Sequence, residues 1–101
     1  MATNTELYGL KNDSALRNRV EMECIIAAEA VMNEIDTTPN HVNRLLWSAS
    51  VFVNPVAEAN RMFMAVLAAN AEFTVEQIQG ASDEAIQANV DAHVDLFATG
   101  V

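Results

Sequence analysis

The sequence is poor in the residue types that build catalytic and cofactor sites. It has one cysteine, two histidines and three glycines among 101 residues. The lone Cys24 excludes a disulfide within the chain, and its place in an apolar run predicts a small buried side chain. Gly9, Gly80 and Gly100 are too far apart for a nucleotide-binding fingerprint. We therefore expect no bound cofactor.

The two histidines do not sit in a metal-binding pattern. A di-iron bundle needs a glutamate three positions before a histidine, but Thr38 precedes His41 and Val90 precedes His93 at that distance. The serines lack the glycine context of a nucleophile elbow. The sequence therefore predicts neither a metal site nor a catalytic site, and we expect the protein not to be an enzyme.

Basic residues are scarce as well. Five Lys and Arg stand against fourteen Asp and Glu, a net charge of −9, and no basic residue follows Arg61. Phosphate backbones and anionic membranes both attract proteins through Lys and Arg. We expect neither direct nucleic-acid binding nor membrane binding. The acidity has two interpretations, which stay open: solubility, or docking of the acidic C-terminal third onto a basic partner.

Long hydrophobic runs are also missing. No segment approaches the roughly 20 apolar residues of a membrane-spanning helix. The first ten residues have no basic stretch followed by an apolar one, so a signal peptide is not expected. A free cysteine fits a reducing compartment.

Helical periodicity is what the sequence does contain. It predicts an all-α fold, a compact bundle of four to five short helices, with residues 1–12 as a polar N-terminal arm and residues 13–101 as a single helical domain. The first helix is expected over residues 14–35. Its main apolar stripe has steps of three and four residues: Leu16, Val20, Cys24, Ala27, Val31 and Ile35.

Two further helices are predicted in the middle of the chain. The first covers residues 39–53, with Thr38 as its N-cap and Pro39 at its first position. Its apolar positions are Val42, Leu45, Leu46, Ala49, Phe52 and Val53. Trp47 lies off the centre of this stripe, at the edge of a core or at an interface. The next helix starts at Pro55 after Asn54 and is apolar all round, so it belongs in the core of the fold or of an oligomer.

Capping signals mark the last two helices. Thr74 and Gln77 form a capping box, and a short helix then ends near Gly80. Ser82 precedes the final helix, which is expected to end at Gly100. Its apolar stripe contains Ile86, Val90, His93, Val94 and Phe97.

The first predicted helix is apolar on more than one side. Met22, Ile25, Ile26 and Met32 all lie off its main stripe. Either the helix is packed from two directions within the domain, or its extra surface meets another chain. In the second case the candidate contact residues are these four, with Trp47 behind them.

Several short motifs carry a family resemblance. They are residues 13–20 (DSALRNRV), Met32-Asn33-Glu34, Thr38-Pro39-Asn40-His41 and residues 78–83 (IQGASD). With them, residues 10–98 resemble small helical virion-associated proteins of tailed bacteriophages. The resemblance implies a virion component, at the capsid or the head–tail neck, that contacts further copies of itself or other virion proteins. It implies a location in the virion, and in the host cytoplasm during assembly.

Two other functions stay open beside this one. The first is a small acidic regulatory protein that binds a host or partner protein. The second is a small enzyme subunit that is inert without its partner. The resemblance transfers no catalytic residues.

Overall fold

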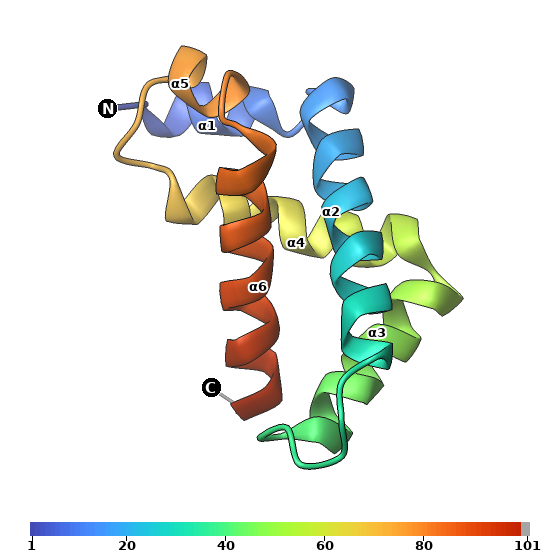
Figure 1. Cartoon of the computed structure of the whole chain (residues 1–101). Coiled ribbons are helices and arrows are strands. Elements are labelled where there is room, and N and C mark those ends of the chain that lie inside the picture. Colours follow the sequence, from blue (N-terminus) through green and yellow to red (C-terminus); the bar gives the residue numbers. More distant parts are fainter. Residues whose placement is uncertain (100–101) are drawn as a thin grey trace.

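The computed structural model describes residues 1–99, which form six helices and no strand (Figure 1). The helices are α1 (Asn4–Leu10), α2 (Ser14–Met32), α3 (His41–Val53), α4 (Pro55–Ala69), α5 (Val75–Gln79) and α6 (Asp83–Thr99). The all-α prediction is confirmed, with one helix more than expected. The predicted helix end at Gly100 lies outside the described residues.

The longer helices pack around α2. Figure 1 shows α2 and α6 side by side, both running away from the end where α1 and α5 lie. α3 returns antiparallel to α2, and α4 crosses behind α2 and α6. The fold is elongated, 42 × 22 × 21 Å, because α1 and α5 extend one end.

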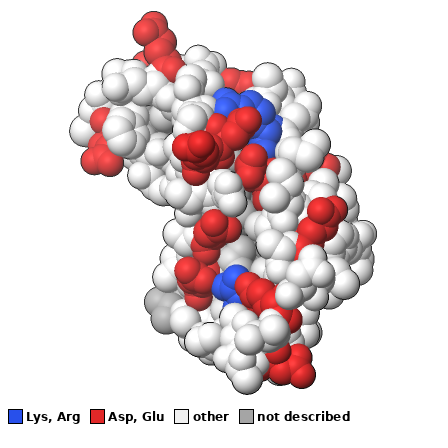
Figure 2. All heavy atoms as spheres, viewed as in Figure 1, with Lys and Arg blue, Asp and Glu red and all other residues white. Residues whose placement is uncertain are grey.

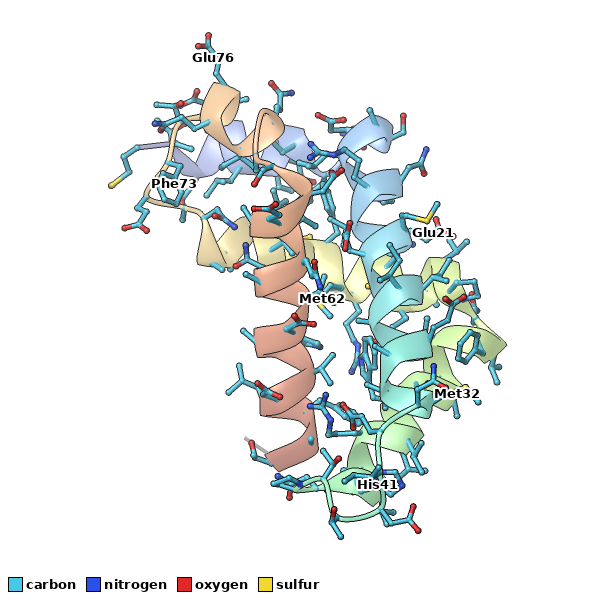
Figure 3. The ribbon with its side chains drawn as sticks, viewed as in Figure 1. Glu21, Met32, His41, Met62, Phe73 and Glu76 are labelled. Atoms are coloured by element: carbon cyan, nitrogen blue, oxygen red, sulfur yellow. The ribbon has the colours of Figure 1, made fainter. Side chains whose placement is uncertain are left out.

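The main stripe of α2 forms the centre of the core. Val20 and Cys24 are fully buried, and the other stripe residues up to Val31 are almost fully buried. Met62 and Phe63 of α4 join the same apolar cluster, and Figure 3 shows Met62 between α2 and α6. Ile35 is an exception, with 71% of its surface exposed, because α2 ends at Met32 and the helical period no longer applies.

The predicted N-terminal arm is wrong. Residues 4–10 are helical because Thr3 and Glu6 form a capping box, in which each side chain accepts a hydrogen bond from the other's backbone N–H. Leu10 is buried in the core. The Ala2 N–H donates to the Phe73 carbonyl at 2.8 Å, which ties the start of the chain to the α4–α5 loop.

The predicted start of α3 is also wrong. The His41 N–H donates to the Thr38 carbonyl, so residues 38–41 make a turn and the helix begins at His41 rather than at Pro39. Asn40 has a positive φ of 58°, a backbone region that asparagine tolerates better than most residues. Elsewhere the predicted caps are confirmed at Asn54, Thr74 and Ser82.

Candidate protein-interaction surface

α3 turns its apolar stripe outward. We call this surface the outer face of α3, and it consists of Val42, Leu45, Leu46, Ala49, Phe52 and Val53. All six are exposed, and the five large side chains expose between 36% and 85% of their surface. The side of α3 that packs on the core carries Trp47, Ser48 and Val51 instead. The stripe that predicted the helix is therefore not its buried side.

Trp47 fixes this orientation. It is fully buried, and its indole N–H donates to a carboxylate oxygen of Glu58 at 3.0 Å. Arg61 pairs with the same carboxylate, so the buried charge of Glu58 has a counterion. The prediction that Trp47 is a contact residue is wrong for the single chain, because its side chain does not reach the surface.

A buried hydrogen bond joins α2 and α3 directly. The Ser48 hydroxyl donates to the Ala28 carbonyl at 2.9 Å. Residues three or four positions away lie on the same side of a helix, so Leu45 and Phe52 flank this contact on α3. On α2 the flanking residues are Ile25 and Met32.

The outer face of α3 therefore continues onto α2. Ile25 is half-buried and packs against the core, whereas Met32 is 60% exposed beside α3, on the side away from α6 (Figure 3). Met22 and Ile26 extend the exposed apolar surface further around α2. Three of the four predicted contact residues on α2 are thus exposed. Whether they touch another protein stays a prediction.

The outer face of α3 carries no free charge. α3 contains no carboxylate, and its one arginine, Arg44, donates to Glu34 at 2.8 Å and to Asp95 at 2.7 Å. The hydrogen bonds from Arg44 lower the pKa of Glu34. These contacts join the α2–α3 loop to α3 and α6. They pair the positive charge of Arg44 with Glu34 and Asp95 instead of leaving it free on α3.

The other arginines are also engaged within the chain. Arg19 pairs with Asp83 at 2.8 Å, Arg61 pairs with Glu58, and Arg17 donates to the Lys11 carbonyl. In the view of Figure 2, the Lys and Arg atoms lie with Asp and Glu atoms directly beside them. Among residues 1–99, most charged side chains that face solvent without an ion-pair partner are therefore acidic.

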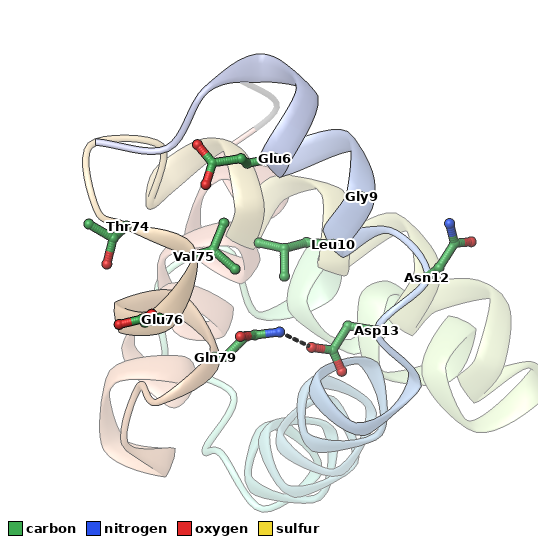
Figure 4. A pocket seen from close by; sticks show the side chains of 9 residues that line it. All are labelled: Glu6, Gly9, Leu10, Asn12, Asp13, Thr74, Val75, Glu76 and Gln79. Atoms are coloured by element: carbon green, nitrogen blue, oxygen red, sulfur yellow. Dashed lines mark hydrogen bonds between the residues drawn. The ribbon is translucent and has the colours of Figure 1, made fainter.

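An open hollow of about 890 Å³ lies between α1 and α5 (Figure 4). Its lining includes three carboxylates, those of Glu6, Asp13 and Glu76, and no basic side chain. Asp13 is already engaged, since it accepts hydrogen bonds from the Leu16 N–H and from Gln79. These bonds lower the pKa of Asp13. The lining of the hollow between α1 and α5 is therefore acidic.

Burial shifts the pKa values of Cys24 and His93 away from their usual values. Cys24 is fully buried, and burial raises the pKa of its thiol to about 12. His93 is half-buried, and burial lowers the pKa of its imidazole. Within the described part of the chain, no three histidine, cysteine or acidic side chains are grouped to hold a metal ion.

No helix in residues 1–99 combines the length and the apolar character needed to cross a membrane. Comparison with protein-family models, with curated proteins and with solved structures found no match. The outer face of α3 and the exposed apolar residues of α2 (Met22, Ile26 and Met32), which we call the outer face of α2, form the candidate interaction surface.

Proposed function

We propose that this protein is a non-enzymatic assembly protein that works by burying the outer faces of α2 and α3 against other proteins. The observation that carries this proposal is the exposure of the whole apolar stripe of α3. Contiguous exposed apolar surface of this kind is typical of protein interfaces.

We further propose that the assembly is the virion of a tailed bacteriophage, at the capsid or the head–tail neck. The resemblance of residues 10–98 to small virion-associated proteins supports this placement. So does the even spread of apolar contact residues along two helices, since structural subunits bind through surfaces rather than through one reactive group.

An acidic regulatory protein is the second candidate. The observation that favours it is the hollow between α1 and α5, whose lining has three carboxylates and no basic side chain. A basic partner segment would be steered towards such a surface. In this case the protein is expected to act away from the virion.

Mass spectrometry of purified phage particles tests the proposed function. Particles made from the genome that encodes this chain are banded on a density gradient, and peptides of this chain are measured against capsid peptides. A fixed ratio to the capsid protein is the expected result. Absence from particles that contain all known capsid and tail proteins would contradict the virion role and favour the regulatory one.

A variant pair connects that result to the surface. Leu46→Asp places a charge on the outer face of α3, where Leu46 exposes 58% of its surface. Leu96→Asp places the same charge on α6, where Leu96 is similarly exposed (52%). We expect Leu46→Asp to reduce incorporation into particles by about tenfold or more, because an interface core excludes unpaired charge. Leu96→Asp is expected to leave incorporation unchanged. Equal incorporation of both variants would show that α3 is not the contact surface.

A further inference from the structure

We propose that the outer face of α3 pairs with the same face of a second copy of this chain, in an antiparallel two-fold arrangement with the two Ala49 residues at the axis. This inference rests on the proposed function and names one partner for its surface. The occupant is another copy rather than a different protein for four reasons: spacing, symmetry, exposed area and the absence of charge on this face.

The spacing of the outer face suits a second helix of the same kind. Val42, Leu45, Ala49 and Phe52 are separated by three, four and three residues. This is the repeat by which two helices interlock side chains along a shared seam. The residues of this repeat are exposed, so no helix of the described chain packs against them.

The outer face is also close to symmetric about its small central residue. When two α3 helices cross antiparallel at Ala49, Leu46 faces Phe52 and Leu45 faces Val53 of the other copy. Large side chains then meet on both sides, and the small Ala49 side chains allow the two backbones to approach at the centre. Val56, 54% exposed at the start of α4, adds apolar surface next to the C-terminal end of α3.

The amount of exposed surface matches what a dimer needs. The outer face of α3 and Val56 together expose on the order of 700 Å², whereas each partner in an interface of standard size buries about 800 Å². The apolar surface on Met32 adds to the α3 area along the same seam. A single helix pair with this area can therefore support a stable dimer.

Charge does not oppose a second copy at this face. Each copy carries a net charge of −9, so two copies repel through most of their surface. The outer face of α3 has no carboxylate, and Arg44 beside it is held by Glu34 and Asp95. A basic partner would gain nothing from this face, whereas two identical acidic chains can meet there.

Cysteine crosslinking tests this geometry directly. The native Cys24 is fully buried, so a single introduced cysteine is the reactive thiol. Ala49→Cys places two thiols at the proposed axis, Val42→Cys places them at opposite ends of the helix pair, and Ala88→Cys is an exposed control on α6. In the antiparallel pair the two copies of residue 42 are roughly 20 Å apart, too far for a disulfide.

We expect Ala49→Cys to form a disulfide-linked dimer at least about tenfold faster than Ala88→Cys or Val42→Cys at low micromolar protein, because pairing raises the local thiol concentration. Fast linking of Val42→Cys as well as Ala49→Cys would overturn the antiparallel geometry. An Ala49→Cys variant that folds by circular dichroism but links no faster than Ala88→Cys would overturn self-pairing. That last result leaves the virion role to be decided separately, by incorporation into particles.

Discussion

Trp47 is the residue whose placement decides which side of α3 faces the core. Its indole is the largest fully buried side chain of the described residues, and its N–H is bonded to the Glu58 carboxylate. Burying a tryptophan removes more apolar surface from water than burying any other side chain on α3. The outward position of Leu46 and Phe52 follows from this choice.

Trp47→Phe tests the contribution of this contact. The variant keeps an aromatic ring but removes the N–H donor to a buried carboxylate, which costs about 2 kcal/mol through the unmade hydrogen bond and the lost volume. We expect the free energy of unfolding in urea to fall by that amount. Phe52→Leu, a change at an exposed aromatic, is the control and is expected to change it by less than about 0.5 kcal/mol. Equal effects of the two variants would contradict the assigned role of Trp47.

Glu23 gives a prediction of pH dependence. It is buried, and its pKa is raised by burial and by the nearby carboxylates of Asp83 and Asp91. A raised carboxyl pKa in the folded state means that the ionised form is destabilising there, so the cost of ionised Glu23 is present at neutral pH and disappears as pH falls through the raised pKa.

We therefore expect Glu23→Gln to be more stable than wild type at pH 7, and to lose this advantage as pH falls through the raised pKa of Glu23. Urea unfolding across this pH range measures the difference. Glu29→Gln, at an exposed position of α2, is the control and should show no such crossover. A Glu23→Gln variant that is less stable than wild type at pH 7 would contradict this assignment.

At the scale of helices and loops, local signals predicted boundaries better than orientation. Thr38-Pro39 has the pattern of a helix start although α3 begins at His41, whereas Asn54-Pro55 and the Thr74–Gln77 capping box mark the starts of α4 and α5 correctly. The same signal is present at Thr3 and Glu6, where the polar composition of the first twelve residues led instead to the prediction of an arm.

Orientation could not be predicted in the same way. α3 is apolar on its outer face and carries a tryptophan on the other side, so periodicity identifies the helix without showing which side is buried. The choice depends on Glu58, eleven residues after Trp47, which receives the indole N–H. The prediction that Met22, Ile26 and Met32 lie off the buried stripe of α2 is confirmed. The prediction that Trp47 lies beside them at a contact surface is wrong, because Trp47 is fully buried.

The capping box of α1 can be tested at this scale. Thr3→Ala removes the hydroxyl that accepts from the Glu6 N–H, and we expect it to lower the free energy of unfolding by about 1 kcal/mol. Thr5→Ala, inside the same helix, is the control and is expected to be neutral or slightly stabilising because alanine favours helix. Hydrogen exchange of the α1 amides reports the local effect. Unchanged α1 protection in Thr3→Ala would contradict the importance of the cap.

At the scale of the whole molecule, the fold separates charge from apolar surface. The arginines are engaged within the chain, the acidic excess faces solvent, and the outer face of α3 remains uncharged. An acidic protein arranged in this way stays soluble while one apolar face remains available for a partner. We propose that this face is buried against a second copy of the chain.

The mass of the protein in solution, measured by light scattering on a size-exclusion column for wild type and for Phe52→Asp, tests this pairing. Wild type is expected to have twice the mass of the chain at micromolar concentration. Phe52→Asp is expected to have the mass of one chain with unchanged helical circular dichroism, because Phe52 is exposed and the fold does not depend on it. Wild type and variant with the same mass at every concentration would contradict burial of the outer face of α3 between copies.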